Sequence, residues 1–188
     1  MQQYQIDSLL ARHCAPTLLG VKAASLIALP DWQVQDPVGL EQTLNQQLRG
    51  QGVVFHLVCR CTQNALLLAY RPSMLVQRLQ TPQARTILLQ CGYDPDAGLD
   101  ALLEHLSRRL QAGQGFPHEI GLFLDYPPAD VQGFIRNQGR NCKLCGYWKV
   151  YSDVDTARSR FTFFDLCRRS LCSLVEQGNT ISQLLTAA

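Results

Sequence analysis

The residues best suited to chemistry gather between His118 and Tyr151, in the segment HEIGLFLDYPPADVQGFIRNQGRNCKLCGYWKVY. This segment contains a histidine beside a glutamate, two adjacent prolines, a CxxC motif and a lysine flanked by aromatic residues. Such groups can act as acids, bases, metal ligands, redox thiols or anion-binding groups. The sequence therefore points to this segment as the place for a functional site.

The CxxC motif, Cys142 and Cys145, has the spacing of half a zinc site, of a pair of iron–sulfur ligands or of a redox dithiol. A tetrahedral zinc ion needs two more ligands, and the other close cysteine pair is Cys59 and Cys61. Because these two share one face of a predicted strand, a four-cysteine site is geometrically possible. The alternative is a pair of loop thiols without a ligand, since free cysteine is commonly a packing residue.

His118 and Glu119 stand at the entrance of the apolar run IGLFL, which predicts a buried strand over residues 120–124. His118 can serve as a general base, a metal ligand or a haem ligand. Strand alternation places His118 and Glu119 on opposite faces, so both reach one pocket only if the strand begins after them. The alternative for His118 is a hydrogen bond to a neighbouring backbone group.

Lys149 lies in YWKVY, which predicts a strand over residues 147–151 with Tyr147, Lys149 and Tyr151 on one face. A lysine between two tyrosines can hold an anionic ligand. The alternative is a surface lysine whose aliphatic stem covers the edge of a sheet.

A local excess of positive charge favours an anion. From Val131 to Tyr151 the chain has no acidic residue, and its basic residues are Arg136, Arg140, Lys143 and Lys149. The whole chain has a formal net charge of only +2, which gives no argument for a nucleic-acid partner. The patch suits a phosphate, a cofactor with carboxylates or an acidic protein, and its alternative is a solvated basic face.

The remaining sequence predicts the elements that position this segment. VVFHLVCRC and ALLLAYR flank a short turn, which predicts a β-hairpin over residues 53–71. Residues 5–14 suit a helix that ends before Pro16, and Asp36 can cap a second helix. Further helices are expected from Pro72, from Thr81, over the leucines between 99 and 110, over PPADVQGFIRNQG, and after a Ser152 or Asp153 cap.

The predicted fold is an α/β or α+β single domain, residues 1–188, with a sheet of about four strands covered by helices. The hairpin 53–71 supplies two strands, and the segments near 120–124 and 147–151 supply the others, joined as a βαβ crossover. Residues 1–115 hold helices and the hairpin, and residues 116–188 form a strand–helix–strand–helix region.

Composition limits the class of protein. The chain has 188 residues, of which 46% are hydrophobic and 17% charged, as in a globular domain. Its start lacks the features of a signal peptide, and no apolar run approaches the roughly 18 residues of a membrane helix. We therefore expect a cytoplasmic protein without membrane insertion. A disulfide framework is not expected there, and the alternatives for its eight cysteines are reduced thiols, metal ligands or redox roles.

The segments APTLLGVKAASL, HEIGLFLDYP, VQGFI and GYWKVY resemble the bacterial domain-of-unknown-function family 3793, common in anaerobic bacteria. The resemblance covers nearly the whole chain. It implies no established activity, but it implies a link to flavodoxin and ferrous-iron uptake through neighbouring genes. In that family HEIG, YP and WKVY form the signature, which favours His118, Glu119, Tyr126, Lys149 and Tyr151 over Cys142 and Cys145.

Three functions fit these observations. The first is an iron- or redox-linked accessory protein that binds an anionic cofactor, such as haem or flavin, or docks an acidic electron carrier such as flavodoxin. Its contacts would be Lys22, Tyr126, Arg136, Arg140, Lys143 and Tyr147. The second is a small enzyme with His118 or Glu119 as acid or base and with Lys149 and Tyr151 stabilising an anion. The third is a metal-binding module built on Cys142 and Cys145 together with either Cys59 and Cys61 or His118.

Overall fold

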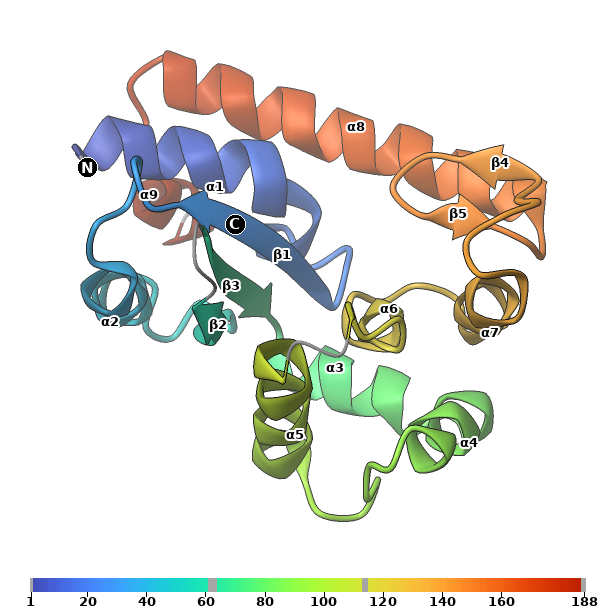
Figure 1. Cartoon of the computed structure of the whole chain (residues 1–188). Coiled ribbons are helices and arrows are strands. Elements are labelled where there is room, and N and C mark those ends of the chain that lie inside the picture. The colour runs from blue at the N-terminus through green and yellow to red at the C-terminus, as the bar shows by residue number, and fades with distance from the viewer. Residues whose placement is uncertain (1, 61–63, 113–114, 187–188) are drawn as a thin grey trace. The chain divides into compact units, whose positions relative to one another are not determined.

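The structure of the protein is a computed structural model that describes residues 2–60, 64–112 and 115–186. The chain divides into two compact units, one of Met1–Pro72 with Phe164–Ala188 and the other of Ser73–Phe163. These units cut across the predicted halves 1–115 and 116–188. Figure 1 shows their helices and strands.

The first unit is built on a three-stranded antiparallel sheet in the order β1–β3–β2. The strands are β1 Ala24–Pro30, β2 Val54–Arg60 and β3 Asn64–Tyr70. β2 and β3 confirm the predicted hairpin, and β1 is a strand that the sequence analysis did not predict. β3 is central, and its neighbours Leu67 and Leu68 are both fully buried although they point to opposite faces.

The predicted alternation along β2 holds only as far as Leu57. A β-bulge between Leu57 and Cys59 shifts the register against β3. Val58 is therefore fully buried, although strict alternation places it with the half-exposed His56.

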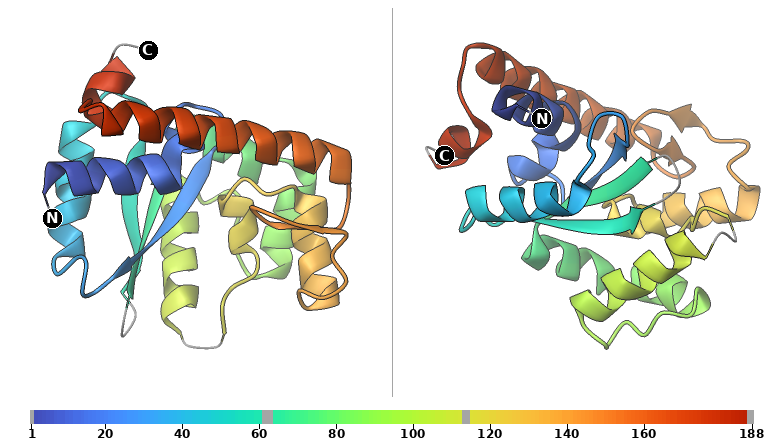
Figure 2. Two further views of the ribbon diagram at one scale, coloured as in Figure 1. Left: turned by 90° about the horizontal axis from the view of Figure 1, so that it is seen from above. Right: turned by 60° about the vertical axis from the view of Figure 1, so that its left-hand side comes forward.

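Helices pack against this sheet and close the core of the first unit. They are α1 Gln3–Leu18, α2 Pro37–Gln47, α9 Ile181–Thr186 and the C-terminal part of α8 Val154–Glu176. α1 packs along β1, and α2 packs along β2 (Figures 1 and 2). Their core includes the buried side chains of Leu10, Ile27, Leu44, Phe55, Leu67 and Leu171.

One helix boundary of the first unit is confirmed and another is wrong. Asp36 caps α2 as predicted, because its Oδ1 accepts a hydrogen bond of 2.9 Å from the backbone N–H of Gly39. α1, however, continues past Pro16 to Leu18. Pro16 lies in the last turn, so its missing N–H removes only one bond from a helix that is about to end.

The second unit is mainly helical. Its elements are α3 Pro72–Leu79, α4 Pro82–Gln90, α5 Leu99–Gln111, α6 Ile120–Phe123, α7 Pro128–Asn137, β4 Leu144–Cys145, β5 Lys149–Val150 and the start of α8. The predicted helices from Pro72, from Thr81 and over the leucine stripe are confirmed. The cap of α8 is confirmed as well, because Asp153 Oδ1 accepts hydrogen bonds of 3.1 Å from the backbone N–H groups of Asp155 and Thr156.

The predicted strand over residues 120–124 is wrong, because this stretch forms the one-turn helix α6. All four residues of α6 are buried. A short run that is apolar throughout shows neither helical nor strand periodicity. The pattern alone therefore cannot distinguish a buried helix from a buried strand. Asp125, which follows with a φ of +60°, turns the chain out of the helix.

The predicted βαβ crossover over residues 120–151 is therefore also wrong. The strand near 147–151 is reduced to β5, which pairs antiparallel with β4 through Leu144↔Val150 and Cys145↔Lys149. The mixed helix-and-strand class is confirmed, and the described strands form one three-stranded and one two-stranded sheet. In the described part of the chain, no helix has both the length and the hydropathy needed to cross a bilayer.

Candidate functional site

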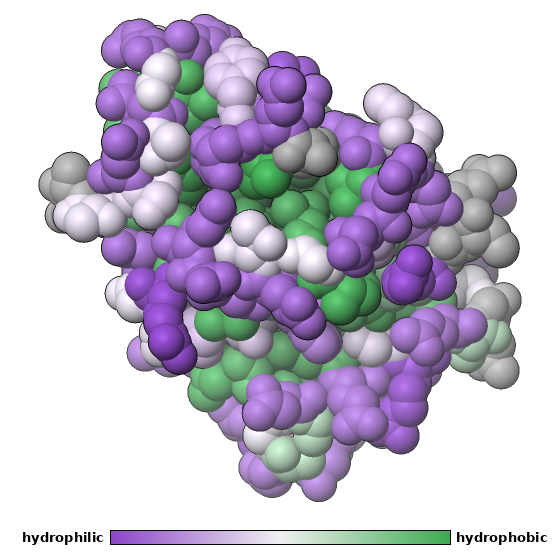
Figure 3. All heavy atoms as spheres, turned by 90° about the vertical axis from the view of Figure 1, so that its left-hand side faces the viewer, coloured by the Kyte–Doolittle hydropathy of each residue, from purple (hydrophilic) through white to green (hydrophobic). Residues whose placement is uncertain are grey.

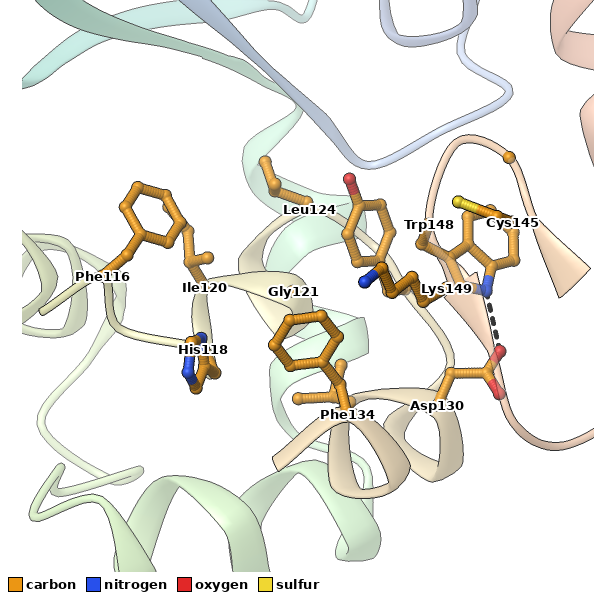
Figure 4. A pocket seen from close by; sticks show the side chains of 13 residues that line it. Phe116, His118, Ile120, Gly121, Leu124, Asp130, Phe134, Cys145, Trp148 and Lys149 are labelled. Atoms are coloured by element: carbon orange, nitrogen blue, oxygen red, sulfur yellow. Dashed lines mark hydrogen bonds between the residues drawn. The ribbon is translucent and has the colours of Figure 1, made fainter. Parts of the chain in front are cut away.

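The second unit contains a cavity of about 370 Å³ that lies within the segment singled out by the sequence. Its walls come from residues 116–126, from α7 and from the β4–β5 hairpin. Figure 4 shows His118 and Phe116 at one end, and Trp148 and Cys145 at the other. Phe134 and Lys149 lie between the two ends (Figure 4).

Aromatic rings form much of the cavity wall. Tyr126 stacks on Trp148 with ring centres 5.3 Å apart, and Phe161 packs edge-on against Trp148 at 4.5 Å. The Arg160 guanidinium lies 5.0 Å from the centre of the Trp148 ring. Burial raises the pKa of the Tyr126 phenol. Phe161 and Arg160 therefore support the Trp148 side of this aromatic wall.

Asp130 fixes the two segments that meet at this wall. Its side chain is buried, and Oδ2 accepts a hydrogen bond of 2.7 Å from Trp148 Nε1 (Figure 4). Oδ1 accepts hydrogen bonds of 2.8 Å from the backbone N–H groups of Tyr151 and Ser152 and from Ser152 Oγ. A buried carboxylate is tolerated when donors surround it in this way. Asp130 thus ties α7 to the end of the hairpin.

Glycines allow the elements around the cavity to approach closely. A Cβ added to Gly133 of α7 would lie 2.5 Å from Tyr151 Cβ. One added to Gly146 in the hairpin would lie 2.2 Å from Phe161 Cε2. A side chain at either position would therefore force its neighbour to shift.

Two nitrogen-bearing side chains face the aromatic surface. The His118 ring meets Phe134 edge-on with ring centres 4.9 Å apart. Lys149 Nζ lies 5.7 Å from the centre of the Phe134 ring and donates a hydrogen bond of 2.7 Å to the carbonyl of Gly139. Because an ammonium has three N–H donors, Lys149 keeps donors for a ligand after this bond.

Glu119 has a different environment from its neighbour His118. It is buried, and its Oε1 lies 2.6 Å from Arg109 Nε and accepts a hydrogen bond of 3.1 Å from Tyr93 Oη. Burial, followed by the charge of Glu119, raises the pKa of the Tyr93 phenol. Glu119 is not among the residues that line the cavity. It anchors the turn that carries His118.

The end of this turn is anchored by a second buried carboxylate. Asp125 Oδ1 lies 2.8 Å from Arg78 Nε, and Asp125 Oδ2 lies 3.3 Å from Arg160 Nη2. Because Arg160 also covers Trp148, this cluster supports the back of the aromatic wall. The segment between Glu119 and Asp125 is therefore fixed at both ends by ion pairs.

The structure gathers only some of the predicted site residues. His118, Tyr126, Lys149 and Cys145 line the cavity. Tyr147 and Tyr151 are close in sequence to the lining residues Trp148 and Lys149, but they do not line the cavity themselves. The Tyr147 ring packs on Phe161 with ring centres 5.6 Å apart. The predicted cations Arg136, Arg140 and Lys143 are exposed and do not line it.

Lys22 lies in the first unit. It is buried, and its Nζ is 5.9 Å from the centre of the Phe164 ring. Lys22 is not a lining residue of the cavity.

The described cysteines do not form a recognisable metal centre. Among the described residues, no group of three or more His, Cys, Asp or Glu side chains could hold a metal ion. Cys59 is buried in the first unit, and Cys61 lies outside the described residues, so the predicted four-cysteine site is not described in full. Cys142 and Cys145 remain a pair of free thiols.

The first unit has a broader hollow of about 870 Å³. Glutamines of α1 and of the loop before α2 line much of it, and Trp32 at its side is 84% exposed. None of the residues predicted to form a site lies there. On the face seen in Figure 3, hydrophilic side chains dominate, and hydrophobic ones show in the hollows between them.

Sequence reasoning missed several residues of the cavity. Phe116, Phe134 and Trp148 supply ring surface, and Asp130 supplies the hydrogen bonds that hold it. Trp148 lies within the YWKVY motif, and this was the one sequence signal for an aromatic wall. The role of Asp130 could not be read from the sequence, because its partners follow it by 18 to 22 residues.

Comparison with known proteins gives one result. The sequence profile of the family described as "Protein of unknown function (DUF3793)" matches residues 10–185. No curated protein and no solved structure matches the chain. The profile spans nearly the whole chain, from α1 to α9. The protein therefore belongs to the DUF3793 family.

Proposed function

We propose that the protein binds a small planar ligand that carries an anionic group, in the cavity between His118 and Trp148. The observation that supports this most strongly is the combination of an aromatic lining with one ammonium group. Phe134 and the Tyr126–Trp148 stack offer ring surfaces, and Lys149 lies over Phe134. Ligand pockets are commonly apolar with a few placed polar groups.

The size of the cavity favours a flavin-type ring over haem. Its volume of about 370 Å³ is near the lower end of the roughly 300–1,000 Å³ of ligand pockets. A three-ring isoalloxazine is smaller than the four-pyrrole macrocycle of haem. The Lys149 ammonium would donate a hydrogen bond to a carbonyl oxygen or to an anionic group of the ring, and His118 would add a second polar contact at the other end.

This proposal gives the protein the role of a redox-linked accessory protein. The enzyme alternative receives less support, because Glu119 is bound to Arg109 and Tyr93 and does not line the cavity. The alternative of a metal module receives less support as well, because the described residues offer no third ligand beside Cys142 and Cys145.

Purification without oxygen tests the proposal. The protein would be isolated from its native host, and the bound material would be identified by absorption spectroscopy, metal analysis and mass spectrometry. We expect a yellow or colourless ring compound with an acidic group, bound in a stoichiometric ratio to the protein chain, and we expect no bound iron. Bound haem or stoichiometric iron would contradict the flavin-type proposal.

A second candidate function is docking of an acidic electron carrier such as flavodoxin. It is favoured by Arg136 and Arg140, which are exposed and form no ion pair with a carboxylate of the described residues. Lys143 is exposed beside them in sequence and donates a hydrogen bond of 2.9 Å to the carbonyl of Ser152. Unpaired surface cations steer an acidic partner and raise its association rate.

Charge reversal tests the docking proposal. The double variant Arg136→Glu and Arg140→Glu should abolish salt-sensitive binding of flavodoxin, measured by surface plasmon resonance at several ionic strengths. Arg168→Glu with Arg169→Glu is the matched control on α8, and it should leave binding unchanged. Binding that survives in the first variant, or that is lost in both, would contradict docking at this patch.

A further inference from the structure

We propose that Cys142 and Cys145 form a dithiol site that reduces small disulfides at the Trp148 end of the cavity. This activity is separate from ligand binding, and it does not depend on the proposed function. Cys145 is the thiol that attacks, and Cys142 is the thiol that resolves the intermediate.

Exposure distinguishes Cys145 from the other described cysteines. Cys14, Cys59 and Cys167 are buried, and Cys91, Cys142 and Cys172 are half-buried. Cys145 is exposed, and its side chain lines the cavity at the Trp148 end (Figure 4). A disulfide that enters the cavity therefore meets this sulfur first.

Cys142, the second thiol, lies three residues before Cys145 in the loop that leads into β4. Asn141, directly before Cys142, has a φ of +58°, which turns the chain sharply into the hairpin. The backbone N–H of Lys143 then bonds the carbonyl of Val150 at 2.8 Å. Both thiols lie close enough to the Tyr151 phenol to influence it electrostatically. The two sulfurs therefore share one neighbour.

That neighbour has an unused hydrogen-bonding group. Tyr151 Oη is the one buried side-chain nitrogen or oxygen of the described residues that has no hydrogen-bond partner. A buried hydroxyl without a partner is unfavourable, and this phenol is free to donate a hydrogen bond to a sulfur anion formed during exchange. Lys149, the cross-strand partner of Cys145, adds a positive charge at the same cavity.

The reaction balances without any further reagent. The Cys145 thiolate attacks one sulfur of the substrate RS–SR, its S–S bond breaks, and RS⁻ leaves as a mixed disulfide forms on Cys145. The Cys142 thiolate then attacks the Cys145 sulfur and releases the second RS⁻. The net change converts RS–SR and two protein thiols into two RSH and a Cys142–Cys145 disulfide, the thiol protons passing to the leaving groups.

The donor set favours this role over a metal site. A structural zinc ion takes four ligands, and a catalytic one takes three from the protein. In the part of the chain that the structure describes, these two cysteines have no third His, Cys, Asp or Glu close enough to join them. Two thiols suffice for exchange, since one attacks and the other resolves.

The test uses the full chain, reduced and kept without oxygen, with hydroxyethyl disulfide as the probe. In the unaltered protein we expect release of the probe thiol and an internal disulfide between Cys142 and Cys145, located by peptide mass spectrometry. Cys142→Ser should trap the mixed disulfide on Cys145. Cys145→Ser should leave Cys142 unreacted on the same timescale. Cys91→Ser, in the same unit, is the control and should behave as the unaltered protein.

Tyr151→Phe provides a second measurement that separates chemistry from folding. It removes only the hydroxyl, so the circular dichroism spectrum should stay the same while attack by Cys145 slows several-fold. The proposal is overturned if the probe adds first to Cys142, if the adduct on Cys145 is not resolved in the unaltered protein, or if Tyr151→Phe reacts at an unchanged rate.

Discussion

Trp148 Nε1 donates a hydrogen bond of 2.7 Å to Asp130 Oδ2, and both side chains are buried. The other oxygen of Asp130 accepts three bonds from Tyr151 and Ser152. One carboxylate thus holds α7 against the hairpin segment that carries Trp148 and Lys149. The hairpin wall of the candidate cavity therefore depends on this carboxylate.

Removing the charge of Asp130 should destabilise the protein. Asp130→Asn keeps the shape but places an NH₂ group where only acceptors fit, which leaves buried donors unsatisfied at a cost of about 1–3 kcal/mol. Urea unfolding followed by tryptophan fluorescence measures the loss of unfolding free energy. Asp155→Asn, at an exposed site, is the control and should change it by less than about 0.5 kcal/mol. Equal losses in the two variants would show that Asp130 has no special role.

A methyl group at position 133 should separate α7 from the hairpin. In Gly133→Ala the new Cβ would lie 2.5 Å from Tyr151 Cβ, so one element must shift. Overpacking of this kind costs about 1–3 kcal/mol. Thermal unfolding by circular dichroism checks the prediction, with Gln132→Ala on the same helix as the control. A Gly133→Ala variant as stable as the unaltered protein would mean that this contact is loose.

The buried thiol of Cys14 should make the protein less stable at high pH. Burial raises the pKa of this thiol from 9.0 to about 12. Between these values the unfolded chain loses the proton and the folded chain keeps it. The unfolding free energy should therefore fall as pH rises above about 9, by up to about 1.4 kcal/mol per pH unit from this group.

Cys14→Ala provides the comparison for this pH dependence. The variant has lost the titrating group, so its unfolding free energy should fall less steeply between pH 9 and 11. Urea unfolding at a series of pH values measures both slopes. Identical slopes would show that Cys14 does not contribute.

The sequence predicted most helices because their ends carry local signals. Asp36 and Asp153 cap α2 and α8, and Pro82 opens α4, so each boundary depends on residues within one turn. β1 and α6 were not predicted, since both are apolar runs whose type depends on packing. All four residues of α6 are buried, so its sequence lacks the alternation of apolar and polar residues that would identify a helix.

The candidate site was predicted only in part, because the sequence reveals residue types but not the packing between distant elements. His118 and Lys149 stand out by residue type, and both line the cavity. Phe134 and Asp130 do not stand out, because an aromatic residue or an acid on a short helix usually has a surface or packing role. Their roles depend on the packing of α7 against the β4–β5 hairpin, and no local sequence pattern predicts that packing.

Glu119 should stabilise the fold rather than act on a ligand. Glu119→Gln weakens the ion pair with Arg109, and it should lower the unfolding free energy by about 1.5–3 kcal/mol. Glu104→Gln, on the exposed side of α5, is the control. Ligand stoichiometry measured by equilibrium dialysis should remain the same in both variants. A stable Glu119→Gln variant that no longer binds ligand would instead support the enzyme hypothesis.

The most direct test of the cavity is a titration of ligand-free protein with flavin mononucleotide, followed by quenching of tryptophan fluorescence. We expect saturable binding with one site per chain. Phe134→Ala and Lys149→Ala should each weaken binding at least about tenfold, which corresponds to about 1.4 kcal/mol. Phe163→Ala, which removes an exposed ring outside the cavity, should leave binding unchanged. No saturable binding, or binding that both cavity variants retain in full, would contradict the proposal that this cavity holds a planar anionic ligand.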